Sequence, residues 1–161
     1  MSDRPIDLRY FTRQEFGPNQ TRGIDWWPCM DPRLLVMLDI FRHQCGAPVS
    51  ISQHGQALGR RLGRDAKSAH NYDRHGVVLA ADTFPNMMDS PDDALEIIDL
   101  AEHVGFTGIG IYPHWSRPGL HLDTRRDREP GSPAEWGAIS VDGSQEYVSV
   151  SEALDAWYDK D

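Results

Sequence analysis

Two segments of the chain combine histidine and aspartate with apolar runs. The first reads SAHNYDRHGVVLAADTFP, in which His70 and His75 precede an apolar run that ends at Asp82. The second reads PGLHLDTR and contains His121 and Asp123 in a His-x-Asp arrangement. Imidazole and carboxylate groups are ligands of Zn²⁺, and both also transfer protons in catalysis. These side chains are therefore the candidates for metal binding or acid-base catalysis in this part of the chain.

Strand geometry would bring some of these groups together. Successive side chains of a strand point to opposite faces, so a strand over GLHLD places His121 and Asp123 on one face. Asp82 ends the apolar run VVLAA, where an unpaired carboxylate would be costly to bury. A catalytic zinc site needs three ligands of the His, Asp or Glu type and an open position. Asp82, His121 and one histidine that precedes Asp82 would meet this requirement.

The pattern alone leaves a simpler interpretation open. A His-x-Asp in a strand is often a structural pair whose members hydrogen-bond each other, because buried polar groups need partners. A metal-free domain held by such pairs is therefore one alternative. Elemental analysis would separate it from a zinc protein.

The two segments, together with the intervening GIGIYPHW, resemble a family of zinc peptidoglycan peptidases. This family contains D-alanyl-D-alanine carboxypeptidases and L-alanyl-D-glutamate endopeptidases, and its fold is shared with D-alanyl-D-alanine dipeptidases and the hedgehog signalling domain. Its pattern is Ser-x-His-x-x-Gly-x-Ala-x-Asp, followed by a strand with a final His, often within His-x-Asp. The matching residues are Ser68, His70, Ala80, Asp82, His121 and Asp123.

The resemblance implies a zinc-dependent hydrolase. Zn²⁺ would be bound by His70, Asp82 and His121, and the substrates would be the stem peptides of peptidoglycan. The segments YFTRQEF and MDPRLLVMLDIFRHQCGAPVSIS resemble the N-terminal part of phage-type members. This implies a phage or prophage protein that is made in the host cytoplasm and acts on the cell wall after release or as a virion component.

The sequence departs from the family pattern in the first motif. His70 lies twelve positions before Asp82, whereas the family spacing is seven, so the extra residues near NYDRH are expected to form a wider loop. His75 has the usual spacing but lacks the preceding Ser-x. We expect His70 to be the ligand and His75 to lie near the site, with the exchange of these roles as the alternative.

The second departure concerns the general base. Several relatives carry an Asp or Glu three residues before the final His, where this chain has Pro118. Asp123 is our expected base, because a carboxylate near a metal-bound water can accept its proton. His114 is a further substitute, and Asp123 could equally orient His121 from behind. The resemblance also implies an Arg that binds a substrate carboxylate. Arg60 and Arg61 in ALGRRLG are the candidates, and we expect Arg60, with the alternative that both are solvated loop arginines.

Composition limits the partners. The chain has 161 residues, a formal net charge of -9, 39% hydrophobic and 9% aromatic residues, which is typical of one folded domain. The negative charge argues against nucleic acid and anionic membranes, although a local basic patch could exist. No apolar run is long enough to span a membrane, and the start MSDRPIDLRYF does not read as a signal peptide. We expect a monomer.

The secondary-structure elements are predicted from helix-capping residues and from the periodicity of apolar residues. Helices are predicted after Asp31-Pro32, after Ser90-Pro91 and after Ser149, with Gly46 and Gly105 ending the first two. Strands are predicted over APVSIS, GVVLAADTF, FTGIGIYP and GLHLDTR, the last two as a hairpin, and RRDREPGSP as an exposed connection.

The predicted fold is a single α+β domain over residues 1–161, with a mainly antiparallel central sheet and two or three helices packed around it. The predicted function is zinc-dependent hydrolysis of peptidoglycan stem peptides. The alternative is a catalytically inactive virion or host-interaction protein that keeps the peptidase fold, which the missing acid at Pro118 and the widened loop favour.

Overall fold

The centre of the molecule is a six-stranded sheet with the strand order β1-β2-β4-β3-β5-β6. The computed structural model describes residues 6–18, 23–54 and 57–160. The strands are β1 (Val49–Ile51), β2 (Ala80–Pro85), β3 (Gly108–Tyr112), β4 (Gly119–Asp123), β5 (Ala134–Val141) and β6 (Ser144–Val148). The helices are α1 (Pro32–Cys45), α2 (Tyr72–His75), α3 (Pro91–Val104) and α4 (Val150–Tyr158), with 3₁₀ turns η1 (Arg13–Phe16) and η2 (Trp27–Cys29).

Each of the three longer helices begins at a side-chain cap. Asp31, Ser90 and Ser149 accept hydrogen bonds from backbone N–H groups in the first turns of α1, α3 and α4. Gly46 and Gly105 follow α1 and α3 with φ of 65° and 111°, the left-handed conformation that glycine adopts at low cost. The predicted beginnings of α1, α3 and α4 and the predicted ends of α1 and α3 are confirmed.

The sheet is mainly antiparallel, as predicted. β2 pairs with β1 and β4, β3 forms a hairpin with β4, and β5 forms a hairpin with β6, all antiparallel. The pair β3 and β5 is parallel. Sequence reasoning placed β1 to β4 and the exposed connection after β4, but it assigned no strand to β5 or β6 and no helix to α2.

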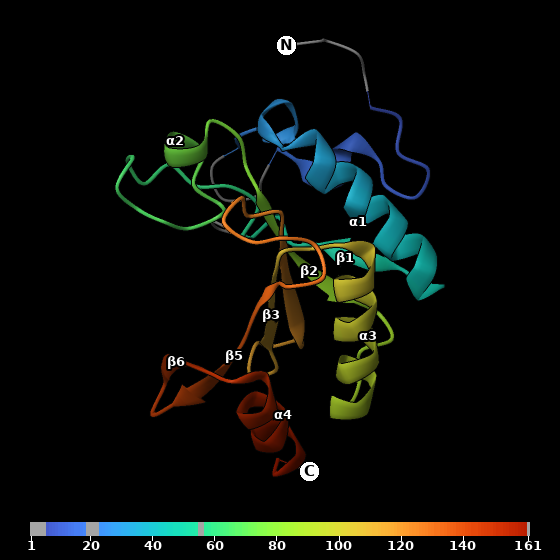
Figure 1. Ribbon diagram of the computed structural model, residues 1–161, viewed down its shortest axis with the longest axis vertical. Helices are drawn as coiled ribbons and strands as arrows, with labels where there is room; N and C mark the ends of the chain where they lie inside the picture. The colour runs from blue at the N-terminus through green and yellow to red at the C-terminus, as the bar shows by residue number, and fades with distance from the viewer. Residues whose placement is uncertain (1–5, 19–22, 55–56, 161) are drawn as a thin grey trace.

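The two faces of the sheet have different roles. Ile109, Ile111, Leu120 and Leu122 point to one face, where they join a core with buried side chains of α1, α3 and α4. Figure 1 shows α1 and α3 along this side of the sheet, and α2 with the loop before it on the other. Because side chains alternate along a strand, Gly110 and His121 face the side that the helices leave open.

No helix in residues 6–18, 23–54 and 57–160 has the length and apolar character needed to cross a membrane.

Candidate metal centre

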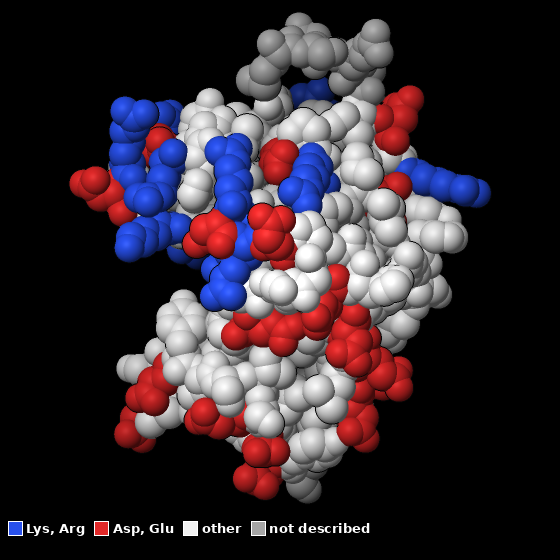
Figure 2. Space-filling view, in the orientation of Figure 1, with Lys and Arg blue, Asp and Glu red and all other residues white. Residues whose placement is uncertain are grey.

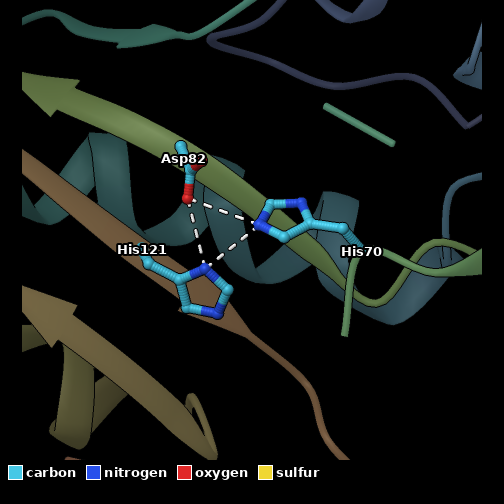
Figure 3. Close-up of side chains that lie close together, drawn as sticks. All are labelled: His70, Asp82 and His121. Atoms are coloured by element: carbon cyan, nitrogen blue, oxygen red, sulfur yellow. Dashed lines mark hydrogen bonds and ion pairs between the residues drawn. The ribbon is translucent and has the colours of Figure 1, made fainter. Parts of the chain in front are cut away.

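Three predicted ligands converge on the open face of the sheet. Asp82 on β2 lies directly opposite His121 on β4 in the antiparallel register, and His70 approaches from the loop before α2. The Nδ1 atom of His121 lies 3.2 Å from Oδ1 of Asp82 and 3.2 Å from Nε2 of His70. The remaining side of the triangle, from His70 Nε2 to Asp82 Oδ1, is 3.5 Å (Figure 3). All three side chains are buried.

These distances fit a tetrahedral metal ion. Ligand bonds of about 2.0–2.1 Å in a tetrahedron place neighbouring ligand atoms about 3.3 Å apart. The measured triangle of 3.2, 3.2 and 3.5 Å matches this spacing without movement of any side chain. His70, Asp82 and His121 could therefore hold one metal ion and leave a fourth position for another ligand.

A buried asparagine fixes the loop that carries His70. The Asn71 side chain donates hydrogen bonds to the carbonyl oxygens of Gly63 and Ala66 and accepts one from the Leu62 N–H. The same residue caps α2. These hydrogen bonds hold the loop of residues 62–66 against Asn71. Because Asn71 directly follows His70, the bonds fix the backbone that positions the imidazole.

The structure separates the roles of the two histidines before Asp82. His70 joins the ligand triangle, whereas the Nε2 atom of His75 lies 3.1 Å from the carbonyl oxygen of Ser68. The extra residues between His70 and the strand form the one-turn helix α2 instead of an open loop. The prediction that His70 is the metal-site histidine agrees with this geometry, and His75 lines the pocket nearby.

Asp123 lies behind His121, away from the ligand triangle. Its Oδ2 atom is 2.8 Å from Nε2 of His121, the nitrogen opposite the one that faces Asp82. The carboxylate is fully buried and also accepts hydrogen bonds from the Arg125 guanidinium, the shortest being 2.6 Å. A carboxylate on the far nitrogen of a ligand histidine fixes the ring and its tautomer. Of the two roles that the sequence left open for Asp123, this geometry favours the orientation of His121 over proton transfer.

Burial and charge together set the protonation of these three side chains. Burial alone would lower the pKa of His121, but hydrogen bonds with Asp123 and Asp82 raise it to about 9. Burial lowers the pKa of His70. Burial would raise the pKa of Asp82, yet the two imidazoles hold it well below its usual range. Without metal the triangle therefore contains a carboxylate, a neutral His70 and a protonated His121.

Burial likewise favours the neutral form of Asp123. The hydrogen bonds and charges of His121 and Arg125 outweigh this effect and hold the pKa of the Asp123 carboxyl well below its usual range. Asp123 is therefore ionised behind His121 at neutral pH.

Two glycines on the site face make room for side chains that surround the ligands. A Cβ atom on Gly108 would lie 2.2 Å from the Asp123 carboxylate, and one on Gly110 would lie 2.5 Å from the Trp136 indole. Gly110 is paired with His121 on one side and with Trp136 on the other. The missing side chain lets the indole lie 5.1 Å from the His121 ring.

The ligands form part of the wall of a pocket with a volume of about 800 Å³. Arg60, the predicted carboxylate-binding residue, lines this pocket, whereas Arg61 pairs with Asp73 on the surface at 2.9 Å. The alternative base His114 is not among the lining residues, and its Nδ1 atom lies 3.3 Å from the carbonyl oxygen of Ala138.

Sequence reasoning missed an aromatic wall of the pocket. Tyr112 stacks on Trp115 with ring centroids 4.3 Å apart, and its hydroxyl accepts a 2.9 Å hydrogen bond from the Trp136 indole. A signal was present in GIGIY, where glycines at alternate positions leave one face of a strand without side chains. That empty face indicates that large groups from neighbouring strands lie over it.

The chain matches no protein-family model, no curated protein and no solved structure. The resemblance to zinc peptidoglycan peptidases therefore depends on the motifs and segments of the sequence itself.

Proposed function

We propose that this protein is a zinc-dependent peptidase that hydrolyses peptide bonds in peptidoglycan stem peptides. The observation that carries the proposal is the ligand triangle of His70, Asp82 and His121 in the wall of a large pocket. The resemblance of the two motifs to zinc peptidoglycan peptidases supplies the substrate class. A phage or prophage origin belongs to the same proposal.

The donor set favours zinc among the common metal ions. Two imidazole nitrogens and one carboxylate oxygen at tetrahedral spacing are typical of catalytic zinc sites with three protein ligands. Mg²⁺ and Ca²⁺ prefer six or more oxygen ligands, which this triangle does not supply. A bound zinc ion would polarise a scissile carbonyl and activate a water molecule.

The other residues of the pocket would position the substrate and transfer the proton. Arg60 lines the pocket and would pair with a substrate carboxylate, for which a guanidinium is suited. Among the described residues, the carboxylates that line the pocket are Asp82 and Asp127. Because Asp82 is a ligand and Asp123 is held behind His121, we assign the proton acceptor to Asp127 and the orienting role to Asp123.

One observation favours a second function, that of a catalytically inactive virion or host-interaction protein. Pro118 stands where several relatives carry the general base, and Asp123, the substitute expected from the sequence, is fully buried and bonded to Arg125. Such a protein would bind zinc through the same triangle but would cleave no peptide.

Hydrolysis of purified muropeptides distinguishes the two functions. Zinc-loaded protein is expected to release a new amine from them, to lose this activity in excess chelator and to regain it with added zinc. The His121→Ala variant serves as the inactive control. Zinc-loaded protein that binds one ion and cleaves no muropeptide would overturn the peptidase proposal and support the second function.

A further inference from the structure

Positive charge gathers at the pocket of this acidic protein. Five Lys or Arg side chains and two Asp side chains line the pocket, although the whole chain has a formal charge of -9. In Figure 2, Lys and Arg gather over the region of α2, while Asp and Glu cover the half of the molecule that contains α3 and α4. The charge of the pocket is therefore opposite to that of the rest of the molecule.

Three of these cations form what we call the cationic rim: Lys67, Arg74 and Arg126. The salt bridges of Arg13, Arg42, Arg61 and Arg125 involve no residue of the cationic rim, and within the described residues Lys67, Arg74 and Arg126 form no ion pair. No carboxylate in residues 6–18, 23–54 and 57–160 forms an ion pair with these three side chains. This is the state expected of groups that receive an anionic ligand.

Backbone carbonyls hold the two arginines of the cationic rim in place. Arg74 donates to the carbonyl oxygens of Arg64 and Asp65 at 3.1 and 3.4 Å. Arg126, in the connection after β4, donates to the carbonyl oxygen of His75 at 3.5 Å. These bonds join α2 to the loop before it and to the connection after β4. The cations therefore border one pocket although they come from distant parts of the chain.

We propose that the pocket selects acidic peptides that carry at least two free carboxylates, the cationic rim binding those outside the reaction centre. The inference rests on the proposed function and narrows its substrate class. Stem peptides whose side-branch acids are free carboxylates would be preferred over stem peptides in which these groups are carboxamides. An amide keeps the shape of the group but removes the charge that the rim attracts.

The test measures binding and needs no hydrolysis. A synthetic stem tetrapeptide with free side-branch carboxylates and its amidated counterpart are titrated into the zinc-loaded protein by calorimetry. Each exposed ion pair contributes roughly 1.5- to 5-fold in affinity, so the acidic peptide is expected to bind about tenfold more tightly. This preference should shrink when the ionic strength rises from about 0.02 to about 0.2 M, because salt screens exposed charges.

A matched pair of charge-reversal variants distinguishes the effect of the cationic rim on peptide binding from the effect of net charge. Lys67→Glu/Arg126→Glu is expected to abolish the preference. Arg64→Glu/Arg128→Glu changes the net charge equally in the same two segments, but neither residue lines the pocket, so it should keep the preference. Circular dichroism and bound zinc confirm that both variants are folded.

The outcomes distinguish this inference from the proposed function. The selection of acidic peptides would be overturned if the two peptides bound equally or if neither bound. It would also be overturned if both double variants lost the preference for the acidic peptide to the same extent. Hydrolysis of both peptides with equal efficiency would leave the peptidase proposal intact and also overturn the selection. Tight binding of the acidic peptide without hydrolysis would support the selection and contradict the peptidase proposal.

Discussion

At the scale of single residues, the account depends on which nitrogen of His121 faces the ligand triangle. Nδ1 faces Asp82 and His70, so Nε2 is left for Asp123. The sequence could predict that His121 and Asp123 share a strand face, because strand periodicity determines that. It could not predict whether Asp123 faces the metal or the back of the ring, because the side-chain conformation of His121 decides this.

The role of Asp123 has a direct test in zinc affinity. Asp123→Asn removes the charge behind His121, and we expect zinc affinity to fall about 10- to 100-fold, as for other carboxylates behind ligand histidines. A residue that acted only as a general base would lower kcat and leave zinc affinity unchanged. Asp127→Asn is the matched control, because Asp127 lines the pocket without a hydrogen bond to a ligand in the described residues. Equal zinc affinities of wild type and Asp123→Asn would contradict the orienting role.

Proton release provides a second test of the triangle. The His121 pKa is raised from 6.5 to about 9, so in metal-free protein its ion pairs stabilise the fold fully below pH 6.5 and are lost as pH rises through about 9. A metal on Nδ1 must displace this proton. We expect zinc binding at about pH 7.5 to release about one proton from His121, and zinc affinity to rise with pH up to about 9. Calorimetry in buffers of different ionisation enthalpy measures this number, and zinc affinity independent of pH would refute the assignment.

At the scale of elements, the parts predicted correctly are those with strong local signals. Asp, Ser, Pro and Gly at helix ends mark α1, α3 and α4, and apolar runs mark β2, β3 and β4. β6 was missed because four of its five residues are exposed, so it lacks an alternating apolar pattern. α2 was missed because it is a single turn whose capping residue, Asn71, also reads as a loop residue.

The packing of β3 against β5 gives a prediction at this scale. Gly110→Ala would place a Cβ atom 2.5 Å from the Trp136 ring, and we expect it to lower the free energy of unfolding by about 1–3 kcal/mol. In the Trp136→Ala background the same substitution should cost much less, because the ring that it meets is gone. Urea denaturation of the four proteins in this cycle provides the measurement. An equal loss of unfolding free energy in both backgrounds would show that Gly110 is not needed to accommodate the Trp136 ring.

At the scale of the whole molecule, the net charge does not reveal the positive charge of the pocket. The formal net charge of the chain, -9, agrees in sign with the acidic surface of the half that contains α3 and α4. Residues far apart in the sequence nevertheless form a basic pocket elsewhere. Net charge is a sum over the chain, whereas recognition depends on where the fold brings charges together. The antiparallel sheet could be predicted from the sequence, but the shape and charge of its open face required the structure.

Metal binding should also stabilise the whole fold, because it ties the loop before α2 to β2 and β4. A ligand that binds only the folded state at about 100 times its Kd stabilises it by about 2.7 kcal/mol, or roughly 5–10 °C in Tm for a chain of this size. We expect this rise with zinc, and none with zinc in His121→Ala. Thermal unfolding followed by circular dichroism measures both. A similar rise in the variant would place the zinc elsewhere.

Anomalous X-ray scattering at the zinc edge would show whether one zinc ion binds to His70, Asp82 and His121. We expect one peak per chain, about 2.0–2.1 Å from His70 Nε2, Asp82 Oδ1 and His121 Nδ1. A crystal grown with zinc that shows no peak in this triangle, or a peak on His75 in place of His70, would contradict it.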